Sequence, residues 1–258
     1  MAEIITFVTV FAFGASIGSF LNVCIYRIPE GKSIISPPSS CPNCSNPIRF
    51  YDNIPIISYL ILFGRCRNCK ASISIQYPIV EALTGFFAVL ILYYFGFTID
   101  GLIYFLFIAS LIVITFIDLK LQIIPDIISL PGIIVGFICS SFLLPTGFIN
   151  SLLGIFLGGG SLFLVAYGYK KVAGIEGMGG GDIKLIAMVG AFLGWKAVIM
   201  TIFAGSFVGA IIGTIAMLIQ GKDTKYAIPF GPFLALGAAL YLFIGQDFIN
   251  WYVRVMWR

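Results

Sequence analysis

Long apolar runs constrain this chain more than any other feature of its sequence. A helix needs about 20 apolar residues to cross the hydrocarbon core of a bilayer, and such runs follow one another along most of the 258 residues. Hydrophobic residues make up 60% of the chain and charged residues only 10%, a balance that soluble domains do not have. We therefore expect an all-α membrane protein with about eight transmembrane helices. The candidate spans are residues 4–25, 79–97, 101–118, 127–146, 149–169, 183–196, 197–219 and 228–246.

The basic residues predict the orientation of these spans. If the N-terminus lies outside, three of the 15 lysines and arginines fall in outer segments and the other 12 fall in inner ones. Cytoplasmic loops carry an excess of lysine and arginine, so we expect the N-terminus to lie outside. The three outer residues are Lys196, Arg254 and Arg258.

The chain contains no histidine, and this absence restricts its chemistry. Nucleophiles that imidazole activates, as in Ser–His and Cys–His enzymes, are excluded, and so are histidine-ligated metals. Acid–base chemistry must come from other groups, chiefly the 11 Asp and Glu residues.

Two aspartates lie at the ends of predicted spans. Asp118 ends the third span, which runs inward, and Asp182 begins the sixth, which runs outward, so both arrive at the inner face. A charged side chain within a span costs about 2.5–3.5 kcal/mol on insertion scales and usually faces a partner or a water-filled cavity. Helix capping at the interface is the alternative for each residue, particularly for Asp182. The topology predicts a pair of carboxylates at one leaflet.

Three glycines, Gly179, Gly180 and Gly181, precede Asp182. Glycine costs a helix about 1 kcal/mol relative to alanine, but it permits a positive φ and the close approach of another backbone. The glycines thus predict clearance for a peptide lying against Asp182. A phosphate-binding loop is the rival interpretation, but no strand precedes the glycines and no Gly-Lys-Ser/Thr sequence follows them.

The one sizeable polar segment, residues 27–77, contains two Cys-x-x-Cys pairs. This pattern is typical of a zinc ion held by four thiolates. Two disulfides are the alternative, but the predicted orientation places this loop in the reducing cytoplasm. Four sulfurs close the coordination sphere, so the zinc would be structural and would supply folding free energy. The predicted ligands are Cys41, Cys44, Cys66 and Cys69.

Four stretches of the chain resemble the type IV prepilin peptidases. The sequence "GMGGGDIKLIAMVGAFLGW" (177–195) is similar to their GxGD block, and "IDLKLQIIPD" (117–126) is similar to the block with their other aspartate. The sequences "GSFLNVCIYRIP" (18–29) and "YPIVEALTG" (77–85) match the opening motifs of the family. The resemblance covers most of residues 14–195, whereas the last third of the chain matches mainly in hydropathy.

The resemblance implies an intramembrane aspartic protease with Asp118 and Asp182 as its catalytic pair. Members of this family cut the short basic leader from prepilins and pseudopilins at the cytoplasmic face of the bacterial inner membrane. Many then methylate the new N-terminus with S-adenosylmethionine. Two adjacent carboxylates share a proton, so one can activate water while the other protonates the substrate. Neither role is assigned to either aspartate by the sequence, and methylation rests on the resemblance alone.

Three further charged residues accompany the predicted pair. Lys184 either stabilises a nearby carboxylate or extends toward the headgroups. Asp126 follows Pro125 and is expected to cap the fourth span, with a catalytic role as the alternative. Glu81 is expected to open the second span, with contact to substrate or methyl donor as the alternative.

The predicted organisation has four parts. They are a first transmembrane helix (1–26), a cytoplasmic four-cysteine loop (27–77), a transmembrane protease core (78–246) and an interfacial tail (247–258). Anionic lipid is an expected partner of the basic loop, and no nucleic-acid partner is expected.

Two other function classes remain open. One is an ion- or proton-coupled transporter that uses the intramembrane aspartates. The other is a zinc-anchored membrane assembly protein without catalysis. A presenilin-like protease is a near neighbour of the predicted one, but it would lack the four-cysteine loop.

Overall fold

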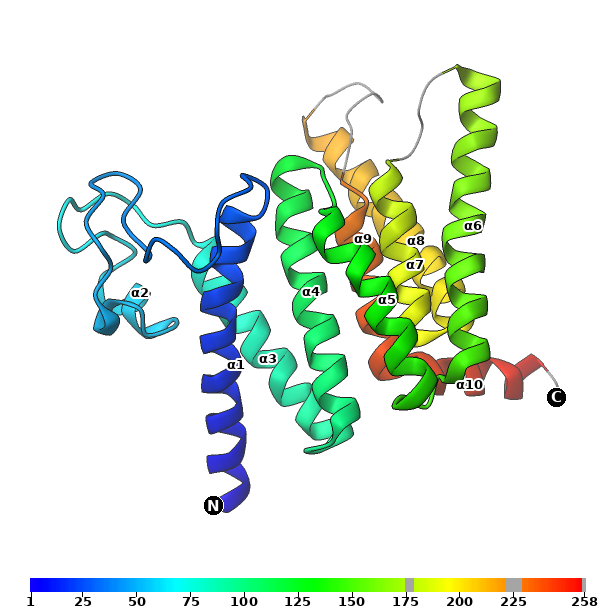
Figure 1. The fold of residues 1–258 in the computed structure, drawn as a ribbon, viewed down its shortest axis with the longest axis horizontal. Helices are drawn as coiled ribbons and strands as arrows, with labels where there is room; N and C mark the ends of the chain where they lie inside the picture. The colour runs from blue at the N-terminus through cyan, green and yellow to red at the C-terminus, as the bar shows by residue number, and fades with distance from the viewer. Residues whose placement is uncertain (175–178, 221–228, 257–258) are drawn as a thin grey trace. The chain divides into compact units, whose positions relative to one another are not determined.

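The computed structural model describes residues 1–174, 179–220 and 229–256. Within these residues the chain is helical, with isolated β-bridges in place of strands (Figure 1). The predicted all-α class is therefore confirmed. Residues Lys222, Lys225 and Arg258, which entered the prediction of orientation, lie outside the described residues.

All eight predicted spans coincide with helices, and their ends agree within a few residues. Six of the described helices are long and apolar enough to cross a membrane, one of them being the continuous segment Gly231–Met256. The helices α5 and α7, which correspond to the fourth and sixth predicted spans, are shorter than these six. The elements are α1 (Ala2–Arg27), η1 (Phe50–Asp52), α2 (Ile57–Ile61), α3 (Gln76–Phe95), α4 (Ile99–Leu121), α5 (Asp126–Phe142), α6 (Gly147–Ala173), α7 (Gly180–Leu193), α8 (Trp195–Gln220), α9 (Gly231–Leu240), η2 (Tyr241–Gly245) and α10 (Gln246–Met256).

The chain forms two compact units, Met1–Val113 and Ile114–Arg258, and α4 continues from one into the other. In the first unit, α1 packs against α3 through small residues. A Cβ at Gly14 would lie 2.6 Å from Ala88 Cβ, and a Cβ at Gly18 would lie 2.7 Å from Glu81 Cα. The two helices can approach this closely only because these positions are glycine.

In the second unit, α7 is the central helix and packs against α5, α6, α8 and α9. Every residue from Leu185 to Leu193 is buried. The backbones of α6 and α7 meet at Gly154 and Gly190, where neither helix has room for a Cβ. A helix that is buried on all sides is apolar on all sides. The sequence of α7 therefore resembles that of a transmembrane span, although the helix is short.

The C-terminal end of α7 lies inside the protein and is capped by hydroxyl groups. With 14 residues, α7 is about 21 Å long, whereas the hydrocarbon core is about 30 Å thick. Its last carbonyls would therefore lack partners in the bilayer. Ser140 Oγ and Ser151 Oγ each donate to Ala191 O at 2.7 Å, and Thr146 Oγ1 donates to Phe192 O at 2.9 Å. These bonds allow α7 to be short and to begin at the glycines before Asp182.

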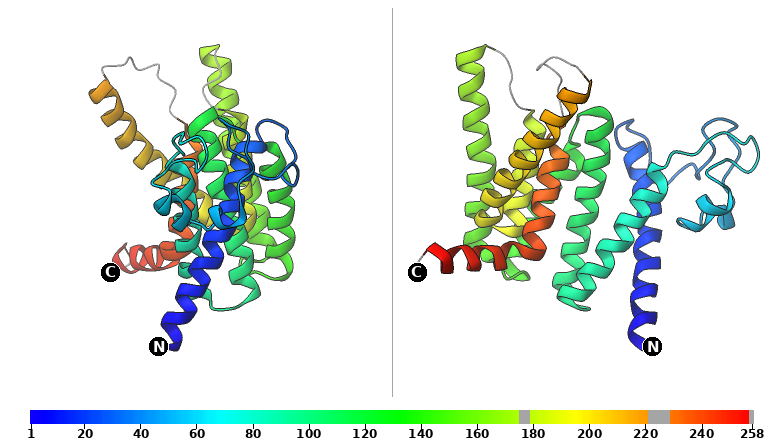
Figure 2. Two further views of the ribbon diagram at one scale, coloured as in Figure 1. Left: turned by 90° about the vertical axis from the view of Figure 1, so that its left-hand side faces the viewer. Right: turned by 180° about the vertical axis from the view of Figure 1, so that it is seen from behind.

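The last helix, α10, runs across the direction of α9, as both ribbon figures show (Figures 1 and 2). Its polar residues Asp247, Asn250 and Arg254 recur at the spacing of one helix face, and apolar residues such as Phe248 and Trp251 occupy the rest. An amphipathic helix in this direction is typical of one that lies in a membrane interface.

Candidate functional site

Asp118 is a buried carboxylate in the last turn of α4. Its side chain is only 4% exposed, and its Oδ2 accepts a hydrogen bond from the backbone N–H of Gly231 at 3.0 Å. Gly231 is the first residue of α9. The bond therefore joins residues that are 113 positions apart in the sequence.

Asp182 is the third residue of α7 and is half-buried. The C-terminal end of α4 and the N-terminal ends of α7 and α9 lie at the same end of the second unit (Figure 1). Asp118, in the last turn of α4, and Asp182, in the first turn of α7, therefore lie at the same end of the helix bundle. A carboxyl pair at one end of a helix bundle can share a proton and carry out acid–base chemistry.

Ile124 links the elements around the two carboxyls. A Cβ at Gly181 would lie 2.8 Å from Ile124 Cβ, and a Cβ at Gly231 would lie 3.3 Å from Ile124 Cδ1. The side chain of Ile124 thus lies against both α7 and α9, close to the carboxylate that Gly231 holds. Substitution of either glycine would push against this side chain.

The three glycines before Asp182 have ordinary backbone conformations, and only one of them is in close contact with another element. Gly179, Gly180 and Gly181 all have negative φ, since none is among the positive-φ residues. Close approach is required only at Gly181, and the group that approaches is the side chain of Ile124 rather than a backbone. A Cβ at Gly180 would meet no atom of the described residues within 4 Å.

Lys184 binds Asp126. Its Nζ donates to Asp126 Oδ1 at 2.6 Å and to Oδ2 at 2.8 Å. Asp126 is the first residue of α5, so the ion pair ties the start of α5 to the first turn of α7, close to Asp182 in sequence. The structure thus gives Lys184 a carboxylate partner, and that partner is Asp126.

Glu81 lies in the first unit. It is the sixth residue of α3, which begins at Gln76, so the expectation that it opens the helix is wrong. Its buried carboxylate accepts the backbone N–H of Ile56 at 2.7 Å. Ile56 has a φ of +62°, which is strained for a β-branched residue. The bond from Glu81 holds this strained turn against α3.

The four cysteines gather as the sequence predicts, with their sulfur atoms within 4.8 Å of one another. Cys41 Sγ lies 3.8 Å from Cys69 Sγ, and Cys44 Sγ lies 4.0 Å from Cys66 Sγ. A tetrahedron with metal–sulfur bonds of about 2.3 Å has edges of about 3.8 Å. The cluster therefore fits one tetrahedral metal ion, and all four thiols are free of disulfides.

Two matched turns build this cluster. In the first, Cys41 N–H donates to Asn46 O and Ser45 N–H donates to Cys41 O. In the second, Cys66 N–H donates to Ala71 O and Lys70 N–H donates to Cys66 O. The residue after each Cys-x-x-Cys pair, Ser45 or Lys70, has a positive φ. The chain thus presents each pair of sulfurs with the same backbone geometry.

Backbone N–H groups favour thiolates in this cluster. The N–H of Ala71 is the main cause that lowers the pKa of Cys69 to about 6. The N–H of Asn46 lowers the pKa of Cys44, but burial and the neighbouring sulfurs outweigh it and raise that pKa to about 11. Thiolates are the form that binds metal, so binding of a metal ion would release protons.

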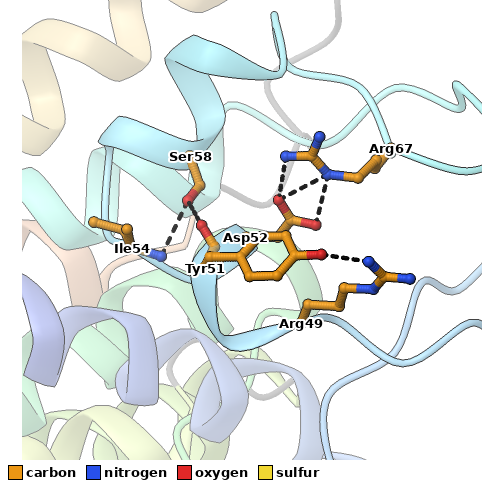
Figure 3. Close-up of polar contacts among 6 residues, drawn as sticks. All are labelled: Arg49, Tyr51, Asp52, Ile54, Ser58 and Arg67. Carbon is orange, nitrogen blue, oxygen red and sulfur yellow. Dashed lines mark hydrogen bonds and ion pairs between the residues drawn. The ribbon is translucent and has the colours of Figure 1, made fainter.

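A polar network connects the second Cys-x-x-Cys pair to the rest of the loop (Figure 3). Arg67 binds both oxygens of Asp52 through Nε and Nη2, at 2.6–3.0 Å, and this guanidinium holds the pKa of Asp52 below its usual value. Ser58 Oγ donates to Tyr51 O and accepts the N–H of Ile54. The paired hydrogen bonds from the Arg67 guanidinium fix the orientation of the Asp52 carboxylate as well as its distance.

Gly231 belongs to this site but is not among the residues predicted from the sequence. Its signal is the stretch Pro229-Phe230-Gly231-Pro232, which stands at the start of the apolar run 228–246. Proline and glycine together mark a chain break or a helix start. Hydropathy alone gives no reason to connect this break with Asp118.

Fold and site together define a multi-pass membrane protein with a four-cysteine cluster that could hold a metal ion and with two carboxyls at one end of a helix bundle. Residues 12–95 match the bacterial peptidase A24 N-terminal domain, and residues 105–214 match the type IV leader peptidase family. The chain belongs to the type IV leader peptidase family.

Curated relatives carry the name prepilin leader peptidase/N-methyltransferase. The protein of Pseudomonas aeruginosa is 36% identical to this chain, and the match covers 93% of this chain and 91% of the relative. The protein of Neisseria gonorrhoeae is 37% identical over 93% and 92% of the two chains. That of Aeromonas salmonicida is 35% identical over 97% and 94%. No solved structure matches this chain.

Proposed function

We propose that this protein is a prepilin leader peptidase and N-methyltransferase. It removes the short basic leader of prepilins and pseudopilins and methylates the N-terminus that cleavage exposes. The observation that carries the peptidase assignment is the pair of carboxyls, Asp118 and Asp182, which three helix ends bring to one end of the second unit. The name shared by relatives at 35–37% identity supports both activities.

The carboxyl pair would hydrolyse the leader peptide bond without a covalent intermediate. One carboxylate takes a proton from water as the water oxygen attacks the scissile carbonyl carbon, while the protonated partner gives its proton to the carbonyl oxygen. The tetrahedral species collapses as the carbon–nitrogen bond breaks: the amine receives the proton taken from water, and the partner carboxylate takes back the proton that it gave to the carbonyl oxygen. The absence of described atoms within 4 Å of a Cβ at Gly180, two residues before Asp182, leaves an extended peptide room to approach.

The four-cysteine cluster would hold a structural zinc ion. Cys41, Cys44, Cys66 and Cys69 supply four thiolates, and zinc is the metal that prefers such a set in a tetrahedron. The methyl donor would be S-adenosylmethionine, which supplies an electrophilic methyl group to the exposed amine. No described residue is assigned to its binding.

The orientation follows from the basic residues. The N-terminus would lie outside a bacterial inner membrane, and the end of the bundle with Asp118 and Asp182 would face the cytoplasm. Residues 27–77 would then form a cytoplasmic loop that touches anionic lipid, residues 78–246 the protease core, and residues 247–258 an interfacial tail. The direction of α10 supports the last assignment (Figure 2).

Mass spectrometry of the reaction product tests both activities at once. Purified protein is incubated with a synthetic prepilin, with and without S-adenosylmethionine. We expect loss of the leader in both reactions and gain of one methyl group only when the methyl donor is present. A prepilin that stays intact under conditions in which the protein is folded contradicts the peptidase assignment. A transporter would give this outcome, but neither the family nor the relatives support one.

Breaking the Lys184–Asp126 ion pair is expected to slow leader cleavage modestly. The pair is partly exposed, with 36% and 57% of the two side chains accessible, and exposed pairs contribute about 0–1 kcal/mol. Lys184→Met and Asp126→Asn should each lower kcat/KM by about fivefold or less. The reversed pair Asp126→Lys/Lys184→Asp should recover part of the loss. A loss of 10³-fold in Asp126→Asn would instead indicate direct participation in the chemistry.

A further inference from the structure

Gly231 acts on Asp118 in two ways. Its backbone N–H donates to Asp118 Oδ2 at 3.0 Å. Its lack of a side chain leaves room for the carboxyl, because a Cβ at this position would lie 2.6 Å from Oδ2 and 3.2 Å from Cγ of Asp118. Any other residue would have to displace the carboxyl group to occupy this position.

Gly231 supplies the one backbone N–H in the first turn of α9 that donates to a side chain outside the helix. The first N–H groups of a helix have no partner within the helix, and Pro232, the next residue, has no N–H. The N–H groups of Phe233 and Leu234 bond to Phe230 O. A single N–H therefore remains in this turn, and it points at Asp118.

Asp118 and Asp182 differ in their hydrogen bonding. The carboxyl of Asp118 contacts the first residue of α9, and Asp182 lies in the first turn of α7, so the dipoles of these two helices favour negative charge on both carboxyls. Of these two carboxyls, only that of Asp118 accepts a hydrogen bond from a backbone N–H of the described residues. A direct N–H bond to a carboxylate favours its charged form and fixes one of its oxygens. Oδ1 of Asp118 is then the oxygen left to meet water.

We propose that Gly231 is a positioning residue of the peptidase: its N–H and its missing side chain hold Asp118 as an oriented carboxylate that takes the proton from water. This inference rests on the proposed function. It assigns the role of general base to Asp118, which leaves the role of general acid to Asp182. It also brings the start of α9, which lies beyond the 105–214 match to the peptidase family, into the catalytic machinery.

The structure separates this role from packing. At Gly231 the three nearest atoms that a Cβ would meet belong to the side chains of Asp118 and Ile124, and none of them is a backbone atom. At Gly237, two turns further along α9, a Cβ would lie 2.8 Å from Thr201 O and 3.0 Å from Thr201 Cα, both of them backbone atoms. Alanine at Gly237 must therefore push α9 away from α8, with no contact to either carboxyl.

Gly231→Ala and Gly237→Ala test the inference as a matched pair in the full-length protein. We expect Gly231→Ala to lower kcat for leader cleavage by about 10²-fold, as a misplaced catalytic group does, with KM and the melting temperature close to those of the unmodified protein. Gly237→Ala should show the reverse, a melting temperature lowered by roughly 2–10 °C and a normal kcat for the folded fraction. A peptide inhibitor with a tetrahedral hydroxyl-bearing carbon should lose affinity for Gly231→Ala by a factor similar to the loss in kcat.

Two outcomes overturn the inference. If Gly231→Ala keeps a normal kcat, Gly231 does not position the base. If its kcat and melting temperature fall together, as for a packing defect, the role is structural. Failure of the proposed function looks different, because the unmodified protein would then leave prepilin uncut or Asp118→Asn would remain active.

Discussion

Asp118→Asn and Asp182→Asn are each expected to lower kcat for leader cleavage by about 10⁴-fold, the upper end of what general acid–base catalysis contributes. Neither amide can accept a proton from water or donate one to the scissile carbonyl. Folding should be retained, because asparagine has the shape of aspartate and, at position 118, keeps an oxygen for the N–H of Gly231. The measurement is the rate of leader release from a synthetic prepilin, with the melting temperature recorded in parallel.

Two controls make this result specific. Asp247→Asn removes an exposed carboxylate of α10 in the same unit and should leave the rate unchanged. Methylation of a synthetic peptide that already lacks its leader should persist in both variants, because the carboxyl pair serves the hydrolytic step. Residual cleavage within about tenfold of normal in Asp182→Asn would be incompatible with a two-carboxylate mechanism.

The placement of Asp118 and Asp182 at the same end of the helix bundle could be expected from sequence because it depends on topology. Apolar length locates the spans, and the alternation of spans brings the end of the third and the start of the sixth to the same face. The same argument gives the ends of α4 and α7 within a few residues. Topology does not determine the direction of a side chain. The sequence therefore leaves two roles for Lys184, and the structure shows that its ammonium group binds Asp126.

Other features depend on contacts that leave little trace in one sequence. The termination of α7 inside the protein needs hydroxyls from α5, α6 and the turn between them, and isolated serines and threonines in apolar helices have many roles. The positive φ of Ile56 is the opposite of what a β-branched residue favours, and only the bond to Glu81 and the surrounding loop account for it. Such local conflicts are resolved by tertiary structure and are expected at constrained sites.

Cys41→Ser and Cys66→Ser are each expected to abolish metal binding and unfold the loop between α1 and α3. From residue 28 to residue 75 only Ser58 and Gly64 are buried, so this segment has no hydrophobic core. Its order has to come from the metal site and from the network around Asp52 and Arg67. Structural zinc contributes about 10–16 kcal/mol of apparent binding free energy to small folds of this kind, far more than one ion pair contributes.

The measurements are the metal content of the purified protein and limited proteolysis of the loop. The unmodified protein should carry one zinc ion and resist cleavage there, whereas either variant, or treatment with a strong chelator, should carry none and be cut within residues 28–75. Cys139→Ser, which changes a cysteine of α5 outside the cluster, controls for the substitution itself and should keep its zinc. The helices of the second unit have their own buried core around α7, so they should stay folded when the loop opens. Zinc retained in either variant, or a loop that resists protease without metal, would mean that something other than the thiolate cluster holds this segment together.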